Sequence, residues 1–331
     1  MNRRVALSSM AASAAAICFP AQAQPGRKIH RIGFVTYTQS NADLAARPRT
    51  DPGELLVEAG LRELGWVEGR NIELLWKSTE GRTELEPGII DEFVRIPVDV
   101  LVVFNNRAAA VAVTKTTTIP VVMVGGFVIE QGLVASLARP GGNLTGLSWE
   151  HTSYQGKLLH LLKSAAPRVS KIAFLGRVAH GDFLPETLAA AADLRLTIFH
   201  VRYEGVEFDR AITEAVRQGA NALVFLGTPQ LLYRQHQQRA HELSARHGLP
   251  DMHETLAAVE SGALMAYDAS ADEAYRRVPY FIHRILKGAK PADLPMEQCG
   301  KIELHLNLGT ARTLGLTFPP TLLTQADRVF E

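Results

Sequence analysis

Short apolar runs alternate with helix-like stretches along the chain, and this alternation restricts the fold more than any other feature. Residues 30–36, 99–104 and 119–124 are apolar runs of strand length, and residues 54–64 and 130–138 are predicted helices. Strands that are apolar on both faces occur in parallel sheets that helices cover on each side. The sequence therefore predicts a doubly wound α/β unit.

The same alternation begins again after a glycine-rich turn at 139–143. Apolar runs at 171–175, 221–226 and 263–267 are separated by amphipathic stretches, of which 230–247 is predicted to be one long helix. The chain has 331 residues, whereas a typical domain has about 150. The predicted fold class is therefore α/β, with two doubly wound parallel-sheet lobes.

The N-terminus has the features of a secretory signal. The basic residues Arg3 and Arg4 precede an apolar run at 5–19, and small residues occupy positions 21 and 23. This order of basic, apolar and small residues is typical of a signal peptide, here predicted as residues 1–23. The apolar run is too short for a stable membrane span. We therefore expect an exported protein, which for a bacterial signal of this type means the periplasm.

Composition excludes several classes of function. The hydrophobic fraction of 47% and the formal net charge of +1 are ordinary for a globular protein, so disorder is excluded. A near-neutral chain offers no broad basic field, and we expect no nucleic-acid partner. Of the two cysteines, Cys18 lies in the predicted signal peptide, which leaves Cys299 without a partner for a disulfide.

A ligand site is predicted where the strands end. In open parallel sheets, ligands bind beyond the carboxyl ends of the strands. The residues expected there have amide, hydroxyl, aromatic or charged side chains, which suit a small polar ligand held between lobes. The predicted ligand-binding residues are Tyr37, Thr38, Asn105, Asn106, Phe127, Arg177, Thr228, Tyr267 and Asp268.

These groups suggest roles by their chemistry. Phe127, Trp149 or Tyr267 is placed to stack on a ring. A guanidinium from Arg107 or Arg177 would hold a carboxylate through two hydrogen bonds. A carboxylate from Asp268 or Glu150 would receive an ammonium group, so the pattern allows a zwitterionic ligand.

The catalytic and metal-binding motifs that the sequence suggests are incomplete. The pair His241-Glu242 would need a second histidine at position 245 to form a zinc-protease helix, and alanine stands there. Residues 146–150 lack the final glycine of a nucleophile elbow. Asp251 and His253 form a possible metal pair, but exposed histidines in contact with solvent are the preferred interpretation. We expect no catalytic residue, no metal and no cofactor.

Four segments resemble one bacterial family. Residues 61–74, 133–148, 262–298 and 301–329 are similar to the substrate-binding proteins of ABC transporters in the tryptophan/tyrosine-type group. The resemblance implies the type I periplasmic-binding-protein fold, in which two lobes are joined by three crossovers that form a hinge. It implies a small-molecule ligand, such as an amino acid or a related aromatic compound, and delivery to an ABC permease in the inner membrane. We also expect a monomer.

The resemblance also implies how the chain divides. The first lobe comprises residues 24–147 and 268–298, and the second comprises 148–267 and 299–331. The segment 36–54 is longer and more polar than the corresponding loop of relatives, and Asn105, Asn106 and Arg107 stand where relatives have small residues. The ligand of relatives is therefore not carried over to this chain.

Two other functions remain open at this point. A ligand-sensing module that presents its state to a membrane receptor would use the same fold. A periplasmic enzyme on a two-lobe scaffold would need a nucleophile–base pair or a metal site, and no such motif was found.

Overall fold

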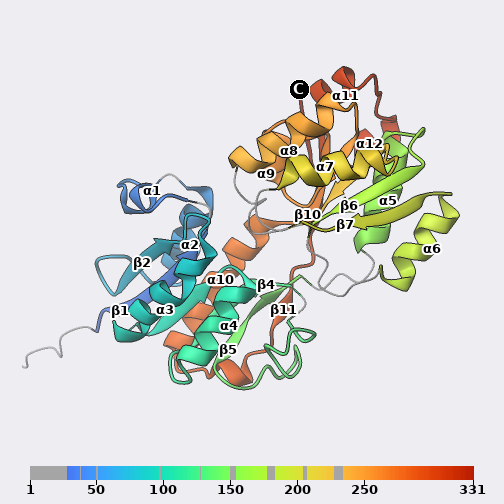
Figure 1. Cartoon of the computed structure of the whole chain (residues 1–331). Helices are drawn as coiled ribbons and strands as arrows, with labels where there is room; N and C mark the ends of the chain where they lie inside the picture. The colour runs from blue at the N-terminus through green and yellow to red at the C-terminus, as the bar shows by residue number, and fades with distance from the viewer. Residues whose placement is uncertain are drawn as a thin grey trace, which may run out of the picture.

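Two α/β bodies make up the molecule, each built on its own β-sheet (Figure 1). The computed structural model describes residues 28–331, apart from 38, 50, 97, 127, 150–153, 177–182, 204–206 and 227–233. The predicted signal peptide therefore lies outside the described residues. The predicted fold class is confirmed, because both sheets are dominated by parallel strands with helices on both faces.

The first sheet, sheet A, has six parallel strands in the order β11-β5-β4-β3-β1-β2. Its strands are β1 (His30–Thr36), β2 (Ile72–Ser78), β3 (Val100–Val103), β4 (Val121–Gly125), β5 (Leu144–Ser148) and β11 (Glu297–Gln298). The helices of this body are α1 (Asn41–Ala45), α2 (Pro52–Glu63), α3 (Glu86–Arg95), α4 (Asn106–Lys115) and α10 (Ala271–Leu286).

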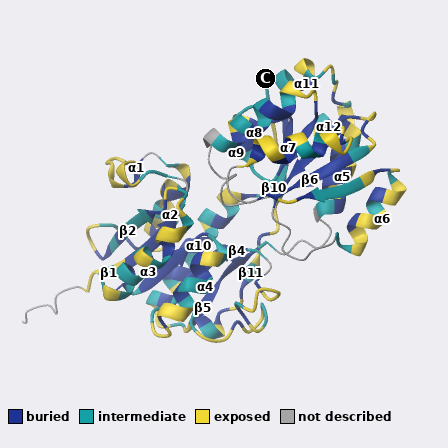
Figure 2. Ribbon diagram, in the orientation of Figure 1, coloured by how far each residue is buried: buried dark blue, intermediate teal, exposed yellow. Residues whose placement is uncertain are grey.

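Helices cover the two faces of sheet A in pairs. Ile32 and Phe34 of β1 belong to one core cluster with α2 and α10, while Val35 belongs to another with α3 and α4. Successive side chains of a strand point to opposite faces, so a strand buried on both sides must be apolar throughout. The apolar runs in the sequence reflect this burial, and Figure 2 shows the strands as mostly buried.

The second sheet, sheet B, has seven strands in the order β13-β12-β10-β9-β8-β6-β7. Its strands are β6 (Lys171–Leu175), β7 (Thr197–Val201), β8 (Ala222–Phe225), β9 (Asp251–His253), β10 (Met265–Ala269), β12 (Ile302–Asn307) and β13 (Arg328–Phe330). The pair β10–β12 is antiparallel. The helices are α5 (Tyr154–Ala165), α6 (Pro185–Asp193), α7 (Phe208–Arg217), α8 (Arg234–Arg246), α9 (Leu256–Glu260), α11 (Leu308–Thr313) and α12 (Pro320–Gln325).

The chain passes between the sheets three times, always at the same edges. Strands β5 and β11 leave sheet A at their carboxyl ends, and β10 leaves sheet B at its carboxyl end to reach α10. The last two connections lie side by side, because the Ser270 amide donates to the Lys301 carbonyl at 2.9 Å. The Cys299 amide likewise donates to the Ser148 carbonyl at 3.0 Å. Because all three connections are short, the carboxyl edges of the two sheets are turned toward each other.

The predicted helix at 130–138 is wrong. The segment forms turns, and Gly132 has a φ of +67° that a right-handed helix does not allow. The Leu133 amide donates to the Val128 carbonyl at 2.9 Å, and the Leu137 carbonyl accepts from the Met296 amide at 2.8 Å. Tertiary hydrogen bonding to the segment that precedes β11 thus replaces the helical pattern.

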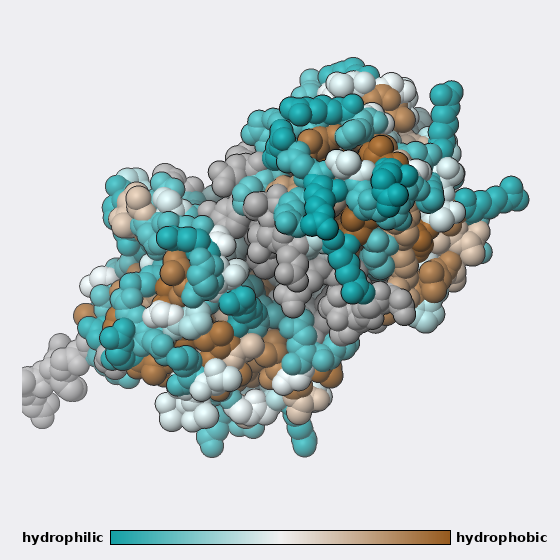
Figure 3. All heavy atoms as spheres, viewed as in Figure 1, coloured by the Kyte–Doolittle hydropathy of each residue, from teal (hydrophilic) through white to brown (hydrophobic). Residues whose placement is uncertain are grey.

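The described surface has mixed polarity. Hydrophilic residues are spread over both bodies on the face seen in Figure 3, in keeping with the balanced charge of the chain. Within the described ranges, no helix combines the length and the apolar character that a membrane crossing needs.

Candidate functional site

Each sheet has a topological switch point, where the helices that follow two neighbouring strands lie on opposite faces of the sheet. In sheet A, β1 and β3 are neighbours, but the chain visits the outer strand β2 between them. As a result, α2 and α4 leave neighbouring strands toward opposite faces. In sheet B, β6 and β8 have the same relation, with β7 outside them. Ligands of open α/β sheets bind in the crevice at such switch points, and here both lie on the facing edges.

Three predicted site residues lie at the switch point of sheet A. Tyr37 follows β1 directly, is half-buried, and packs against the core cluster under α2 and α10. Asn105 and Asn106 follow β3 and begin α4. The structure thus brings the loops after β1 and β3 to one place, as neighbouring parallel strands require.

The two asparagines make hydrogen bonds within the protein. Asn105 caps α4, because its Oδ1 accepts from the Ala108 amide at 2.7 Å. Asn106 pairs with the backbone of Gly126: its Oδ1 accepts from the amide at 3.0 Å, and its Nδ2 donates to the carbonyl. These bonds fix the shapes of the loops after β3 and β4, and ligand contact by either amide stays a prediction.

Asn105 contacts a buried carboxylate, that of Glu86, which the sequence analysis did not select. Glu86 begins α3 and is fully buried, and its Oε1 accepts from Asn105 Nδ2 at 3.0 Å. The Nε atom of Arg107 lies 3.1 Å from the other oxygen, Oε2. Burial raises the pKa of Glu86, although the Asn105 hydrogen bond and the Arg107 charge oppose the rise.

The remaining described residues, Tyr267 and Asp268, are neighbours on β10. Tyr267 packs against a core cluster of the second body, and burial together with Asp327 raises its pKa. The Oδ2 atom of Asp268 accepts from the Leu256 amide at 3.0 Å and so caps α9. Its Oδ1 lies 3.3 Å from Nε2 of the fully buried His305. Asp268 therefore has a structural partner on each oxygen.

Thr38, Phe127, Arg177 and Thr228 lie outside the described residues. In the sequence they follow β1, β4, β6 and β8 within three positions. Their contact with a ligand stays a prediction.

Asp251 and His253 are not exposed, and this corrects the expectation of solvated histidines. His253 is 2% exposed and stacks on Phe225, with ring centroids 4.5 Å apart. Asp251 Oδ2 lies 3.3 Å from His241 Nδ1 and 3.2 Å from His253 Nε2. Burial alone would raise the pKa of Asp251, but these two hydrogen bonds lower it. Among the described residues, no group of three or more side chains is arranged to hold a metal ion.

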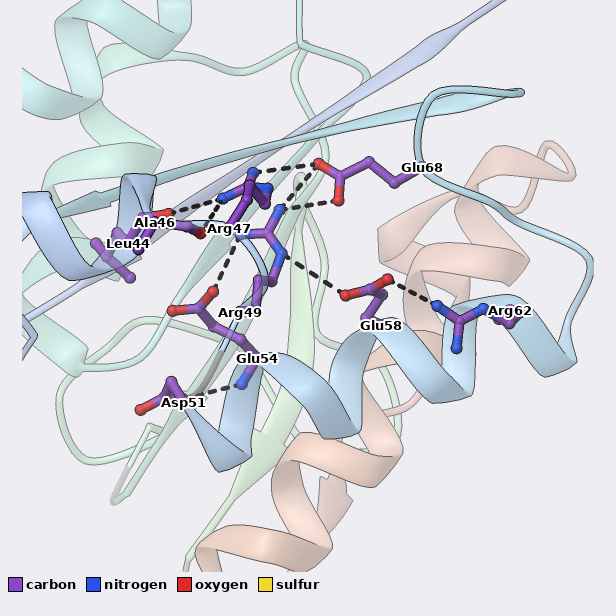
Figure 4. A network of polar contacts seen from close by, with 9 residues as sticks. All are labelled: Leu44, Ala46, Arg47, Arg49, Asp51, Glu54, Glu58, Arg62 and Glu68. Atoms are coloured by element: carbon purple, nitrogen blue, oxygen red, sulfur yellow. Dashed lines mark hydrogen bonds and ion pairs between the residues drawn. The ribbon is translucent and has the colours of Figure 1, made fainter.

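The long polar segment after β1 is held by an arginine, as Figure 4 shows. The Arg49 side chain is 3% exposed. Its Nη1 lies 3.0 Å from Glu54, its Nη2 lies 2.9 Å from Glu68, and its Nε lies 3.7 Å from Glu58. This network fastens the segment to α2 and to the turn before β2, so it fixes the outer side of the loop that leaves the switch point.

Two surface hollows lie away from both switch points. One, of 420 Å³, adjoins Val201 and Tyr203 at the end of the outer strand β7. The other, of 430 Å³, adjoins Lys28 and Asp99 near the beginning of β1, on the opposite edge of sheet A. The topology therefore favours the two switch points over either hollow.

Two parallel-dominated sheets joined by three crossovers are the architecture of a type I periplasmic binding protein. Solved structures agree with this class. A conserved domain protein from Vibrio cholerae has a TM-score of 0.78 at 22% identity, and the match covers 91% of this chain and all of that one. An ABC domain from Streptococcus pneumonia in complex with L-Trp has a TM-score of 0.77 at 21% identity, covering 92% of this chain and all of that one.

Sequence comparison identifies the family. The model described as "ABC transporter substrate binding protein" matches residues 56–330, and the chain belongs to this family. A tyrosine-binding protein from Clostridioides difficile (strain R20291) is 21% identical over 278 residues, which cover 83% of this chain and 80% of that protein. The family is one of substrate-binding transport proteins and not a class of enzymes, and the resemblance seen in the sequence is confirmed.

Proposed function

We propose that this protein is the periplasmic solute-binding component of an ABC importer. A signal peptide at residues 1–23 directs its export, and the mature chain acts as a monomer. It captures a small ligand between two lobes, one built on sheet A and one on sheet B, and delivers it to a permease in the inner membrane. In sequence, the proposed lobes are 24–147 with 268–298, and 148–267 with 299–331.

The observation that carries this proposal is the position of the two switch points. Both lie on carboxyl edges that three short connections turn toward each other. A ligand between these edges would contact both lobes at once and would favour the arrangement in which they are closest. In the sequence, each of the nine predicted residues belongs to β10 or follows β1, β3, β4, β6 or β8 within three positions.

An aromatic amino acid is the first ligand to test. One relative is named a tyrosine-binding protein, and one similar structure is a complex with L-Trp. Micromolar binding corresponds to about −8 kcal/mol, which a few charge-assisted hydrogen bonds of about 1.5–3 kcal/mol each and one stacked ring would supply.

Native mass spectrometry of the freshly purified mature chain tests the proposal, followed by a thermal-shift screen of amino acids, aromatic acids, amines and sugars. A ligand at a hundred times its Kd stabilises the folded state by about 2.7 kcal/mol, which raises Tm measurably. We expect a bound small molecule or a clear shift with tyrosine or tryptophan. A protein that carries no small molecule and responds to no compound of the screen would refute the proposal.

A further inference from the structure

Glu86 is a buried carboxylate at the carboxyl edge of sheet A. It is the first residue of α3, has no exposed surface, and is held on one oxygen by Asn105 at 3.0 Å. Asn105 is itself fixed, since its own oxygen caps α4. Burying a carboxylate destabilises the folded state unless charges and hydrogen bonds compensate for the lost hydration. The groups around Glu86 therefore matter for its role at this edge.

Arg107 is the charged partner of Glu86, and the two side chains differ sharply in exposure. The Arg107 side chain is 57% exposed, while that of Glu86 is fully buried. The contact uses Nε of Arg107, at 3.1 Å from Glu86 Oε2. Within the part of the chain that the structure describes, the terminal Nη1 and Nη2 groups of Arg107 donate no hydrogen bond.

This arrangement differs from an ordinary surface ion pair. In the Arg217–Glu214 pair at the end of α7, the arginine uses Nε and Nη2 to bind both carboxylate oxygens, and neither side chain is buried. At Arg107 the nearest contact of the buried carboxylate is with Nε, and no hydrogen bond holds the terminal Nη1 and Nη2 groups. A guanidinium fork matches a planar carboxylate through two parallel hydrogen bonds.

The position of Arg107 suits its Nη1 and Nη2 groups to contact with a ligand. It lies in the first turn of α4, directly after β3, beside the switch point of sheet A. The N-termini of α3 and α4 both lie at this edge, and their dipoles favour negative charge there. The only acidic partner of Arg107 among the described residues is Glu86 itself.

We infer that Arg107 receives an anionic group of the ligand, a carboxylate, and that Glu86 is a positioning residue that orients Arg107 for this contact. The inference rests on the proposed function. It assigns the ligand class, a carboxylate-bearing small molecule, and it adds Glu86, which the sequence analysis did not select.

Matched compounds test the ligand class. L-Tyrosine has both charged groups, tyramine lacks the carboxylate, and 3-(4-hydroxyphenyl)propionate lacks the ammonium. Calorimetric titration of the full mature chain with these three, and with any compound found bound after purification, gives the affinities. We expect the two carboxylates to bind at least tenfold more tightly than tyramine, since charged hydrogen bonds contribute about 1.5–3 kcal/mol each.

Substitutions test the two residues separately. Arg107→Ala should reduce carboxylate affinity about tenfold or more and remove the preference over tyramine, while Arg107→Lys should retain part of it. Glu86→Gln keeps the shape and the acceptor for Asn105, but it places an amide NH2 beside Arg107 Nε. It should weaken carboxylate binding several-fold without lowering the Tm of the unliganded protein. Arg217→Lys and Glu214→Gln are the matched controls and should leave all affinities unchanged.

The outcomes separate the inference from the proposed function. If the bound compound has no anionic group, or if Arg107→Ala keeps the affinity for carboxylates, the inference is wrong and the proposed function stands. If Glu86→Gln lowers Tm but leaves the affinities intact, Glu86 has only a structural role and its positioning role is refuted. If no compound binds at all, both the function and the inference are refuted.

Discussion

At the scale of single residues, the polar groups at the strand ends make hydrogen bonds within the protein that the sequence does not reveal. Asn105 caps a helix, Asn106 braces the loop at Gly126, and Asp268 caps α9. Small polar side chains suit both helix caps and ligand contacts, because each uses the same oxygen acceptor. Only the partners present in the structure distinguish the two uses.

Asp268→Ala should destabilise the protein even without ligand. The substitution removes the acceptor for the Leu256 amide and the carboxylate nearest to the buried His305, so we expect a loss of about 1–3 kcal/mol. Asp268→Asn retains an oxygen for Leu256 and should lose less. Urea unfolding of both variants checks this. Equal midpoints for Asp268→Ala and the wild-type protein would show that these contacts contribute nothing.

Glu86→Gln should change how stability depends on pH. The pKa of Glu86 is raised, so its ionised form destabilises the folded state above the folded pKa, and this effect vanishes below the unfolded pKa. The variant should therefore be more stable than the wild-type protein at pH 8, and the difference should shrink as the pH falls toward 4. Urea midpoints measured across this range test the sign, and a difference that grows on acidification would contradict it.

At the scale of elements, the buried strands and amphipathic helices could be predicted, and the short elements could not. Strands such as β3 and β4 are apolar along their whole length, which is typical of a strand buried on both faces. In contrast, β9 has three residues and α9 has five, too few to show a period. The segment 130–138 has the composition of a helix, but its backbone hydrogen bonds to Val128 and Met296 hold it in turns.

Substitution by alanine should change the stability of the protein in opposite directions at two glycines. Gly146 lies within β5 at a φ of +137°, and a Cβ there would lie 2.0 Å from the Met123 carbonyl oxygen. Gly146→Ala should therefore destabilise by about 3 kcal/mol or prevent folding. Gly88 lies in α3, where a Cβ meets nothing within 4 Å. Gly88→Ala should stabilise by about 0.5–1 kcal/mol, and thermal unfolding measures both changes.

At the scale of the whole molecule, neither body is a continuous piece of chain. Helix α10 follows strand β10 of sheet B in the sequence but supplies Val278, Phe281 and Ile282 to the core under sheet A. It packs against α2, and Trp66 Nε1 donates to His283 Nδ1 at 3.1 Å. The first body is therefore complete only when the chain has crossed to the second and returned.

A fragment of residues 24–148 should consequently fail to fold cooperatively. Without α10, one face of sheet A would expose a large apolar surface, and burial contributes about 25 cal/mol per Å². Joining residues 271–298 to the fragment through a flexible linker should restore a cooperative transition. Urea unfolding followed by circular dichroism compares the two proteins, and a sharp transition in the short fragment would contradict the assignment of α10 to its core.

The sequence by itself determined the fold class, because strands buried on both faces must be apolar and the helices between them must be amphipathic. It also predicted a ligand site beyond the carboxyl ends of the strands, whereas the strand order that makes β1 and β3 neighbours came from the structure. Only the tertiary structure decided which polar groups at that edge are already bonded, and it paired the buried Glu86 with Arg107. That pairing joins residues 21 positions apart on two helices, and a hydrophobic pattern carries no information about it.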